Sequence, residues 1–487
     1  MNAVVSIPLP RFATDAFLPY TSFVVVLAML FGAGGTQGWS DAVVQLAALP
    51  LLAWALFKLT PSQLGRGGRG AIILLCAILA LPVLQLIPLP PSLWSSLPGR
   101  REFASAYEAA GMALPWLPIS LNPSATQLGL LSLLPATAIF LAILSLEQRQ
   151  RRILIVLMFI VAFASVVLDL QQTWEGPDSP LRFYTGNTER FRAVGFFADS
   201  NHNAAFLYST VPFIIAWAIG LILDRRRNRA IGLALLALLT LTVIFGLTTA
   251  LSRAGTGLLF VAGLSGLLLV WRHSRGQSGR RLLRFAIGAN VVALILAFQF
   301  GFVVFLQRAQ EQGLKDDRWP VARITSQAAI ANLPFGSGFG TFVPVYDEFA
   351  PRTLLAETYV NHAHNDWLEL WLTGGLPAII LVVGFLAWFG VATFRLWSRG
   401  QPEAPVLDLA LAQAASIVIV LLLLHSVVDY PLRTPAISVL FAMACAFLIP
   451  PRKVEQRVQM SRGIESIAPA NNIGPRNGYR DLVQGIN

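Results

Sequence analysis

Charged residues are scarce in this chain. They make up 13% of its 487 residues, whereas about a quarter of an ordinary soluble protein is charged. Hydrophobic residues account for 55%, and apolar runs of about twenty residues recur along most of the length. This composition excludes a soluble globular enzyme, a fibrous protein and a disordered chain. The sequence therefore predicts a polytopic integral membrane protein.

Cysteine and lysine are also nearly absent. The two cysteines, Cys76 and Cys445, lie far apart in apolar runs, which excludes a disulfide framework and a cysteine-based metal site. The net charge of +11 comes almost entirely from arginine, and no basic stripe marks a soluble nucleic-acid-binding fold. The sequence contains no Walker motif, no serine nucleophile elbow and no haem motif. We therefore expect neither a nucleic-acid partner nor a cofactor.

Apolar windows of bilayer length predict an all-α fold with about twelve transmembrane helices. The first window is too long, and too closely followed by the second, to be a cleaved signal sequence, so we interpret it as an uncleaved helix. The predicted spans are 20–37, 41–58, 70–88, 126–146, 152–171, 202–223, 230–250, 254–271, 283–306, 372–395, 406–428 and 434–450.

The distribution of basic residues predicts that both termini are cytoplasmic. In that orientation roughly two thirds of the 36 Lys and Arg residues lie on the inner side. Three long segments then face outward, at 89–125, 172–201 and 307–371. We divide the chain into N-terminal transmembrane helices (1–171), a core that includes the long outer loop (172–400), C-terminal transmembrane helices (401–450) and a disordered cytoplasmic tail (451–487).

The 307–371 loop, between the ninth and tenth spans, is too long and too polar for a simple connector, and such segments usually carry function. Val321, Ile324 and Ala328 recur at helical spacing, which predicts an amphipathic helix over 318–332 on the outer face. The glycine-rich run 336–340 follows it. Because that run lacks the strand–turn–helix context of a nucleotide loop, we expect no nucleotide there.

A polar cluster, Phe191–Ala205, leads into the sixth span. Its Arg192 offers a planar fork that matches a phosphate, while Asn201 and Asn203 can cap the helix and line its positive end. An interfacial arginine with an ordinary capping asparagine would give the same pattern. Charge placed at the membrane boundary is costly, so these residues are candidates for a functional site.

A second candidate, Arg253, lies in a very tight outer turn between the seventh and eighth spans. It is the only charge between two long apolar runs, on the side where arginine is disfavoured. A snorkelling anchor is the alternative explanation. An anchor does not need Gly255 and Gly257, however, and these glycines allow the backbone to approach a partner closely.

The third cluster lies just before the tenth span and contains His362, His364 and Asp366. A histidine can take a proton near neutral pH, so either imidazole is a candidate base for a hydroxyl nucleophile. In an extended strand all three side chains would share one face, as in a zinc site. Trp367 stands where the familiar hydrolase motif has a further histidine, so we do not expect a metal. Structural histidines are the remaining alternative.

A weaker cluster ends the eleventh span. His425 and Asp429 are four residues apart, so they would share a helix face and support one another. We interpret this pair as structural.

In this order the clusters resemble the O-antigen ligase and O-antigen polymerase superfamily of bacterial membrane glycosyltransferases. The resemblance covers roughly residues 190–395, with an echo at 425–433, and the first five spans match only in being hydrophobic. One departure is Pro377-Ala378, where family members often have a glycine. The matching stretches are Arg192–Ala205, Ser252–Gly255, Leu333–Phe342 ahead of Tyr346, and His364-Asn365 followed by Leu368-Glu369-Leu370 and Gly375-Leu376.

The resemblance implies a GT-C-like, metal-independent, inverting enzyme of the bacterial inner membrane. Such an enzyme transfers a glycan on the periplasmic side from an undecaprenyl-diphosphate carrier to an acceptor hydroxyl of a glycan, of lipid A-core or of a protein. Carried over by position, the catalytic residues would be Arg192, Arg253 and His364. The residues expected to bind substrate are Asn201, Asn203, His362, Asn365, Asp366, Arg323 and Tyr346.

A multi-span secondary transporter or a carrier of lipid-linked glycans is the rival interpretation, because about twelve spans with both ends inside is also a common carrier layout. Carriers usually show internal repeats and polar groups near the membrane midplane. The polar clusters of this chain lie at one face, and its halves show no obvious self-similarity. These features favour the transferase.

Overall fold

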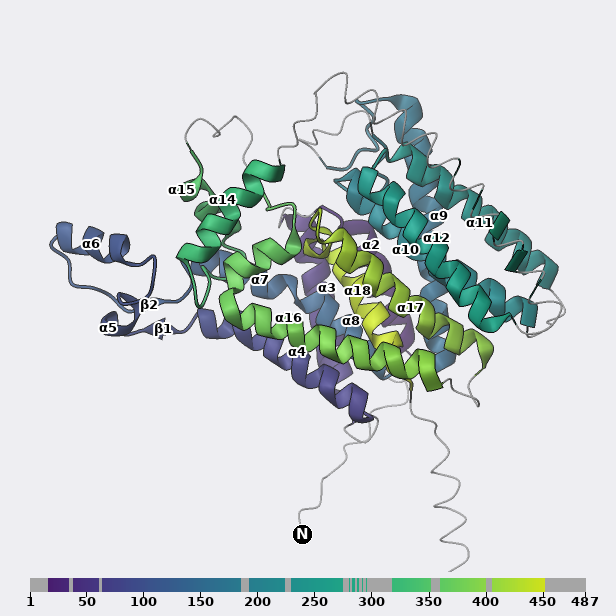
Figure 1. Cartoon of the computed structure of the whole chain (residues 1–487), viewed down its shortest axis with the longest axis horizontal. Coiled ribbons are helices and arrows are strands. Elements are labelled where there is room, and N and C mark those ends of the chain that lie inside the picture. The colour runs from purple at the N-terminus through teal and green to yellow at the C-terminus, as the bar shows by residue number, and fades with distance from the viewer. Residues whose placement is uncertain are drawn as a thin grey trace, which may run out of the picture. The chain divides into compact units, whose positions relative to one another are not determined.

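The computed structural model describes residues 16–34, 38–60, 64–184, 192–223, 229–274, 318–351, 360–399 and 405–451, together with isolated positions between 280 and 295. The described residues belong to one compact unit, Met1–Pro451. Its helices are α2 (Phe17–Phe31), α3 (Trp39–Lys58), α4 (Arg66–Gln85), α5 (Pro91–Trp94), α6 (Arg101–Ala109), α7 (Pro123–Ser132), α8 (Leu134–Leu144), α9 (Gln148–Glu175), α10 (Ser200–Leu223), α11 (Arg229–Thr249), α12 (Arg253–His273), α14 (Arg318–Ala331), α15 (Phe342–Phe349), α16 (Asp366–Arg399), α17 (Val406–His425) and α18 (Pro435–Phe447), with the 3-10 turn η3 (Pro431–Arg433) (Figure 1).

Within the described residues, nine helices are long and apolar enough to cross a membrane, and α2 and α18 are shorter apolar helices. In that count α7 and α8 form a single span, although the helix is interrupted at Leu133. These helices confirm a polytopic all-α protein. The predicted span 283–306 lies almost entirely outside the described residues, so the total of twelve stays a prediction.

The tenth span differs in detail from its prediction. α16 begins at Asp366, and Gly375 interrupts it with φ 58° and ψ −149°. The amide of Leu376, which follows the break, donates to the carbonyl of Pro334 at 2.8 Å. Pro377, the departure noted in the sequence, therefore stands in the first turn after the break, where a missing N–H costs least.

A ribbon of two short strands, β1 (Pro88–Leu89) and β2 (Leu117–Pro118), connects α4 to α7. The strands pair antiparallel, with Pro88 opposite Pro118 and Leu89 opposite Leu117. The short helices α5 and α6 lie between them in the chain. This ribbon is the only sheet among the described residues.

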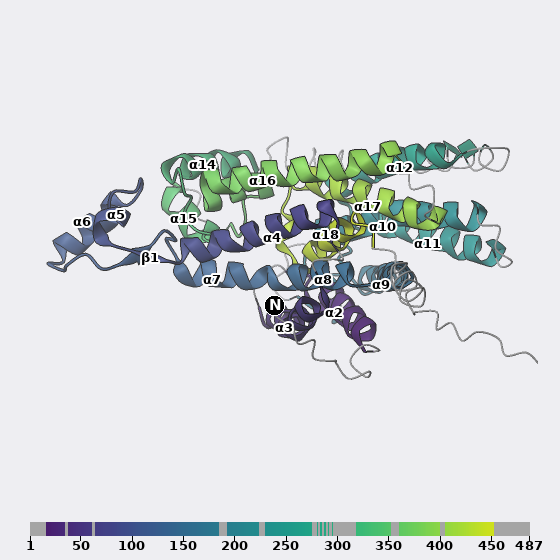
Figure 2. The same cartoon turned by 90° about the horizontal axis from the view of Figure 1, so that it is seen from below.

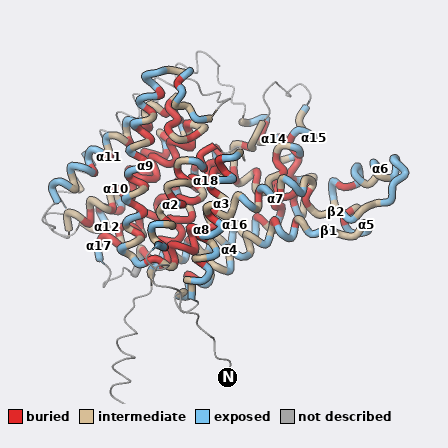
Figure 3. Tube along the Cα trace, turned by 180° about the vertical axis from the view of Figure 1, so that it is seen from behind, coloured by how far each residue is buried: buried red, intermediate tan, exposed pale blue. Residues whose placement is uncertain are grey.

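The most buried helices form the centre of the unit. α10 packs against α12, α17 and α11, while α8 packs against α18 and α3. Buried positions fill most of the membrane-length segments of α17 (72%) and α10 (61%), but few of those in α4 (17%) and α16 (11%) (Figure 3). α4 packs mainly on α16 and α7, and these helices run side by side (Figure 2). Thus α4 and α16 lie at an edge of the bundle and have few buried positions.

The long loop contains the predicted amphipathic helix, which is α14. It packs on α16 and on α15, and its apolar stripe of Val321, Ile324 and Ala328 is buried. Phe342 and Val345 from α15 complete this small core. The period of the apolar residues was thus sufficient to locate the helix.

The glycine-rich run after α14 is fastened by one glutamine. The Gln85 amide donates to the carbonyls of Thr373 (2.9 Å) and Phe335 (3.2 Å), and its oxygen accepts from the amide of Phe339 (2.9 Å). Gly338 has φ 113°, and a Cβ there would meet Ser120. The run therefore joins α4 to the beginning of α16, a packing role that agrees with its lack of a nucleotide-binding context.

The tight turn before α12 brings two helices close together. α11 ends at Thr249 and α12 begins at Arg253, as the sequence predicted. A Cβ on Gly255 would lie 2.5 Å from the Ala204 methyl carbon of α10, whereas a Cβ on Gly257 would meet nothing within 4 Å. Gly255 is therefore the residue that permits the close packing of α10 and α12.

We expect Gly255→Ala to lower the thermal stability of the purified protein, because overpacking costs about 1–3 kcal/mol. Gly257→Ala is the matched control on the same helix, and it should leave the midpoint of thermal unfolding unchanged or slightly raised. Equal midpoints for the two variants would contradict the close packing.

Candidate active site

The backbone next to Arg192 is held by a buried glutamine of α9. The Gln172 amide donates to the carbonyls of Gly195 (2.9 Å) and Leu181 (3.0 Å). Its oxygen accepts from the amides of Gly195 (3.1 Å) and Val194 (3.3 Å). One side chain thus satisfies four backbone groups that burial would otherwise leave unpaired. These four hydrogen bonds hold the backbone next to Arg192 in place.

Asn203 of α10 supports the same turn from within the bundle. Its amide nitrogen donates to both carboxylate oxygens of Asp169, at 3.0 and 3.1 Å, and its oxygen accepts from the Ser165 hydroxyl at 3.1 Å. Asn203, Asp169 and Ser165 are fully buried. Gly195, with φ 55°, lies directly on these side chains, and a Cβ there would clash with Ser165. These contacts hold Asn203 within the protein, and its role in substrate binding stays a prediction.

Arg253 is tied to the Arg192 segment through Asn201. The Ser252 hydroxyl donates to Asn201 Oδ1 at 2.7 Å, and it accepts from the Gly255 amide as the N-cap of α12. Arg192 donates to the hydroxyl of Ser200, the first residue of α10, at 3.5 Å. The positive ends of α10 and α12 are thus in contact through Asn201 and Ser252, an arrangement that favours an anion.

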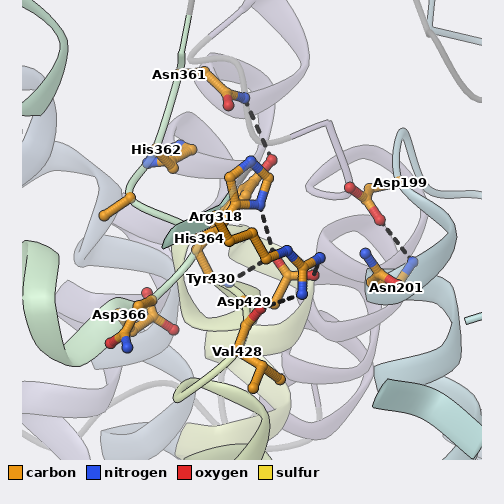
Figure 4. Close-up of polar contacts among 12 residues, drawn as sticks. Asp199, Asn201, Arg318, Asn361, His362, His364, Asp366, Val428, Asp429 and Tyr430 are labelled. Atoms are coloured by element: carbon orange, nitrogen blue, oxygen red, sulfur yellow. Dashed lines mark hydrogen bonds and ion pairs between the residues drawn. The ribbon is translucent and has the colours of Figure 1, made fainter. Parts of the chain in front are cut away.

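His364 points at a buried carboxylate. Its Nδ1 lies 3.4 Å from Asp429 Oδ1, which also accepts from the Tyr430 amide at 3.0 Å (Figure 4). Asp429 is fully buried, while the His364 side chain is 30% exposed. His364 has φ 49°, a left-handed conformation that a non-glycine residue adopts only when its surroundings impose it. When a carboxylate holds an imidazole at Nδ1, the other ring nitrogen, Nε2, can accept a proton.

The environment keeps Asp429 ionised. Burial alone would raise its pKa, but the hydrogen bond with His364 and the neighbouring His202 and His425 outweigh burial and lower the pKa well below its usual range. Arg318 approaches the other carboxylate oxygen at 3.9 Å and donates to the Val428 carbonyl at 2.7 Å. The carboxylate is therefore an anion throughout the neutral range.

Tyr430 packs against three histidines. Its ring centroid lies 4.3 Å from His362, 4.9 Å from His202 and 5.1 Å from His364. Its hydroxyl accepts from the Asn361 amide at 3.3 Å. Burial, followed by the nearby Asp199 and Asp429, raises the pKa of Tyr430 far above its usual value, so the phenol stays neutral. Tyr430 therefore acts as a rigid spacer that fixes the imidazole planes.

The alternating His362, His364 and Asp366 do not share one face. His362 Nδ1 lies 3.1 Å from Glu369, His364 faces Asp429, and Asp366 accepts from Arg433 Nε at 3.1 Å. Asp366 also accepts from the Ser426 hydroxyl. The three side chains are thus directed to separate partners, and the described residues contain no group of three or more His, Cys, Asp or Glu side chains placed to hold a metal ion.

The other predicted substrate-binding residues have different surroundings. Asn365 is the N-cap of α16, accepting from the Leu368 amide at 3.0 Å, and its own amide donates to the Val427 carbonyl. Tyr346 is buried in the core of α14 and α15, where it stacks on Phe342. Arg323 is exposed on α14. A role for Arg323 in binding stays a prediction, while Tyr346 and Asn365 already have structural partners.

Sequence reasoning did not assign Asp429, Tyr430, Glu369 or Arg433 to the site. The expected proximity of His425 and Asp429 is confirmed, with Nε2 and Oδ2 3.9 Å apart, but α17 ends at His425, so the two do not share a helix face. Among the described side chains, His202 Nε2, His425 Nε2 and Asp429 Oδ2 are buried without a hydrogen bond. The sequence signal that could have found the site residues after α17 is their position: they are polar residues immediately after an apolar span.

Residues 238–383 match the family model described as O-antigen ligase. This match supports the resemblance of this part of the chain to the O-antigen ligase and polymerase superfamily. The match includes Arg253 and His364, whereas Arg192 and Asp429 lie outside it. A search of the curated proteins gave no match. The O-antigen ligase domain supports glycan transfer of the ligase or polymerase type in general, and it does not favour the transporter.

We expect Gln172→Leu to destabilise the protein and to weaken donor binding, because each buried backbone group left unpaired costs about 1–3 kcal/mol. The neighbouring Gln171 is exposed and bonds only Glu175 among the contacts described, so Gln171→Leu is the matched control. Thermal unfolding and the KM for the donor measure the two effects. If both variants behaved like the wild type, Gln172 would not position Arg192.

Proposed function

We propose that this protein transfers a glycan from an undecaprenyl-diphosphate donor to an acceptor hydroxyl at the periplasmic face of the bacterial inner membrane. The observation that carries the proposal is the pairing of His364 with the buried Asp429 at 3.4 Å, near the beginning of α10, whose His202 packs on Tyr430. Arg192 precedes α10 in the chain, and Arg253 is the first residue of α12. Asn201, which bonds the N-cap of α12, lies on one side of the His364–Asp429 pair (Figure 4).

The donor diphosphate is held by Arg192 and Arg253. A guanidinium binds phosphate oxygens through two parallel hydrogen bonds, and the helix ends add further positive potential. Charge develops on the diphosphate as the glycosidic bond breaks, so groups that already face it stabilise the transition state. These two arginines take the place that a divalent cation has in many glycosyl transfers, which makes the reaction metal-independent.

His364 accepts the proton of the acceptor. The acceptor oxygen attacks the anomeric carbon from the face opposite the diphosphate, and the bond from that carbon to the diphosphate oxygen breaks. The electron pair leaves with the diphosphate, the hydroxyl proton moves to His364 Nε2, and the configuration inverts. Asp429, which faces Nδ1, orients the ring and stabilises the imidazolium.

The distribution of arginines along the helices supports a location of the site on the periplasmic side. Arg151, Arg152, Arg272 and Arg395 belong to the ends of α9, α12 and α16 that lie opposite the site along their helices. The positive-inside rule favours the cytoplasm for that end. The beginnings of α10, α12 and α16, which carry the site, then face the periplasm.

We expect Arg192→Lys and Arg253→Lys each to lower kcat/KM for the lipid-linked donor, because lysine cannot bind a phosphate through a planar fork. The loss of one charged hydrogen bond, about 1.5–3 kcal/mol, corresponds to roughly a ten- to hundred-fold decrease. The assay follows transfer of a labelled glycan by the purified protein. Arg229→Lys, an exposed residue at the opposite end of the bundle, is the control. Full activity of a correctly folded Arg253→Lys protein would refute the phosphate role.

We expect His364→Ala to reduce the transfer rate by about 10²–10⁴-fold, the usual contribution of a general base. Asp429→Asn should cost on the order of 100-fold through lost orientation. Transfer rates of the purified variants test both effects, with His273→Ala at the opposite end as the control. Full activity of a correctly folded Asp429→Asn protein would exclude a role for this pair.

A further inference from the structure

Tyr208 and His425 form a buried hydrogen-bonded pair next to the Asp429 carboxylate. Tyr208 lies in α10 and His425 is the last residue of α17, and these two helices pack against each other. The Tyr208 hydroxyl is 2.8 Å from His425 Nδ1, and both side chains are fully buried. Neither side chain takes part in the proposed proton transfer.

The other ring nitrogen of His425 faces Asp429. Its Nε2 lies 3.9 Å from Asp429 Oδ2, while Oδ1 of the same carboxylate lies 3.4 Å from His364 Nδ1. The carboxylate therefore lies between two imidazoles and has one oxygen toward each. A continuous series of polar side chains leads from the interior of the bundle to the candidate base, and its members are Tyr208, His425, Asp429 and His364.

The surroundings of His425 determine which of its nitrogens carries the hydrogen. A neutral imidazole has one N–H, and its other nitrogen accepts a hydrogen bond. If Nδ1 carried the hydrogen, the lone pair of Nε2 would face the Asp429 carboxylate, and their repulsion is strong in a buried site. With the hydrogen on Nε2, the Tyr208 hydroxyl donates to Nδ1 and the N–H faces the anion. Only the second arrangement suits both neighbours, so Nε2 carries the hydrogen.

The N–H of His425 opposes rotation of the Asp429 carboxylate. Oδ1 accepts from the Tyr430 amide at 3.0 Å and faces His364. Oδ2 faces His425 and Arg318, each at 3.9 Å. The Arg318 side chain is 36% exposed, whereas His425 is fully buried, so His425 is the partner whose position the packing of the bundle determines. A carboxylate held in one orientation keeps the imidazole that it contacts in one orientation.

We propose that Tyr208 and His425 are positioning residues that hold the Asp429 carboxylate toward His364. Tyr208 determines the tautomer of His425, the Nε2–H of His425 holds Oδ2, and Oδ1 then orients His364. The pair of His425 and Asp429, which the sequence indicated as structural, thereby acts on the reacting group. This inference rests on the proposed function and deepens it by adding two residues that act through Asp429.

NMR of isotope-labelled ring nitrogens tests the tautomer without a measurement of activity. The chain contains five histidines, so the spectrum of the full chain in lipid nanodiscs is simple, and His425→Gln identifies the His425 signals by their loss. We expect the wild type to carry the hydrogen on Nε2. Tyr208→Phe should move the Nδ1 signal, because the phenol no longer donates to it. Tyr20→Phe, which removes a hydroxyl that donates to the Ala47 carbonyl, is the matched control and should leave both signals unchanged.

Transfer kinetics test the positioning role. Tyr208→Phe and His425→Leu should each lower kcat about ten-fold and leave the KM for the lipid-linked donor unchanged, because a misoriented base weakens the transition state and not donor binding. His425→Gln should restore most of kcat, since the glutamine side-chain nitrogen can replace the Nε2–H. The matched control is His273→Leu, because His273 also ends a span and its Nε2 lies 2.8 Å from Gln413 Oε1. Thermal unfolding verifies that each variant folds.

A double-variant cycle separates positioning from stability. Because His425 acts through Asp429, adding His425→Leu to Asp429→Asn should lower kcat no further. A purely structural role would lower the midpoint of thermal unfolding in both backgrounds and leave kcat per folded molecule unchanged.

Three results would overturn the inference. A hydrogen on Nδ1 alone in wild-type His425 would contradict the tautomer and the contact with Asp429 that depends on it. Wild-type kcat in correctly folded Tyr208→Phe and His425→Leu would make the pair structural. An undiminished effect of His425→Leu in the Asp429→Asn background would mean that His425 does not act through Asp429. In all three cases the wild type still transfers glycan, whereas a wild type that transfers none would refute the proposed function itself.

Discussion

The buried carboxylate of Asp429 is the group on which the outer end of this protein depends. An ionised carboxylate away from water is costly unless charged and hydrogen-bonding partners surround it. The partners come from four separate parts of the chain: His364 before α16, Arg318 at the start of α14, His425 at the end of α17, and the amide of Tyr430. The contacts of this one carboxylate therefore join the start of α14 and the segment before α16 to the end of α17, and one of them is made by His364.

Two regions with different side-chain chemistry lie near the Asp429 carboxylate. The side of α10 and α12 carries arginines and helix N-termini, whereas the side of α4, α16 and α18 has an apolar cavity whose polar end is rich in carboxylates. A group transfer from a charged leaving group to a neutral hydroxyl requires that difference, because an anion and a hydroxyl must be recognised on either side of the reacting carbon. The segment that matches the O-antigen ligase family model, residues 238–383, includes parts of both sides.

The sequence was most informative where the signal was local. A single arginine between two apolar runs located the turn at Arg253, and apolar residues at helical spacing located α14. It was least informative about partners. Asn203 and Asp366 were predicted to bind substrate, and nothing in the sequence indicated that their partners within the protein are Asp169 and Arg433.

The sequence also contained little information about the partners of Asp429. Its nearest sequence neighbour of interest, His425, is four residues away, and that spacing alone indicated a structural pair. Its hydrogen-bond partner His364 is 65 residues away in the chain and is reached through the packing of α16 against α17. Pairings of this kind depend on tertiary structure, and one sequence carries no direct record of them.

The most direct test of the central claim is the glycan profile of a strain that lacks this protein, complemented by the wild type or by His364→Ala. Lipopolysaccharide, secreted polysaccharide and lipid-linked intermediates are separated and quantified. We expect one of the two surface glycans to be lost while its lipid-linked precursor accumulates, with rescue by the wild type and none by His364→Ala. Unchanged glycan pools in the deletion strain, or full rescue by His364→Ala, would contradict the account.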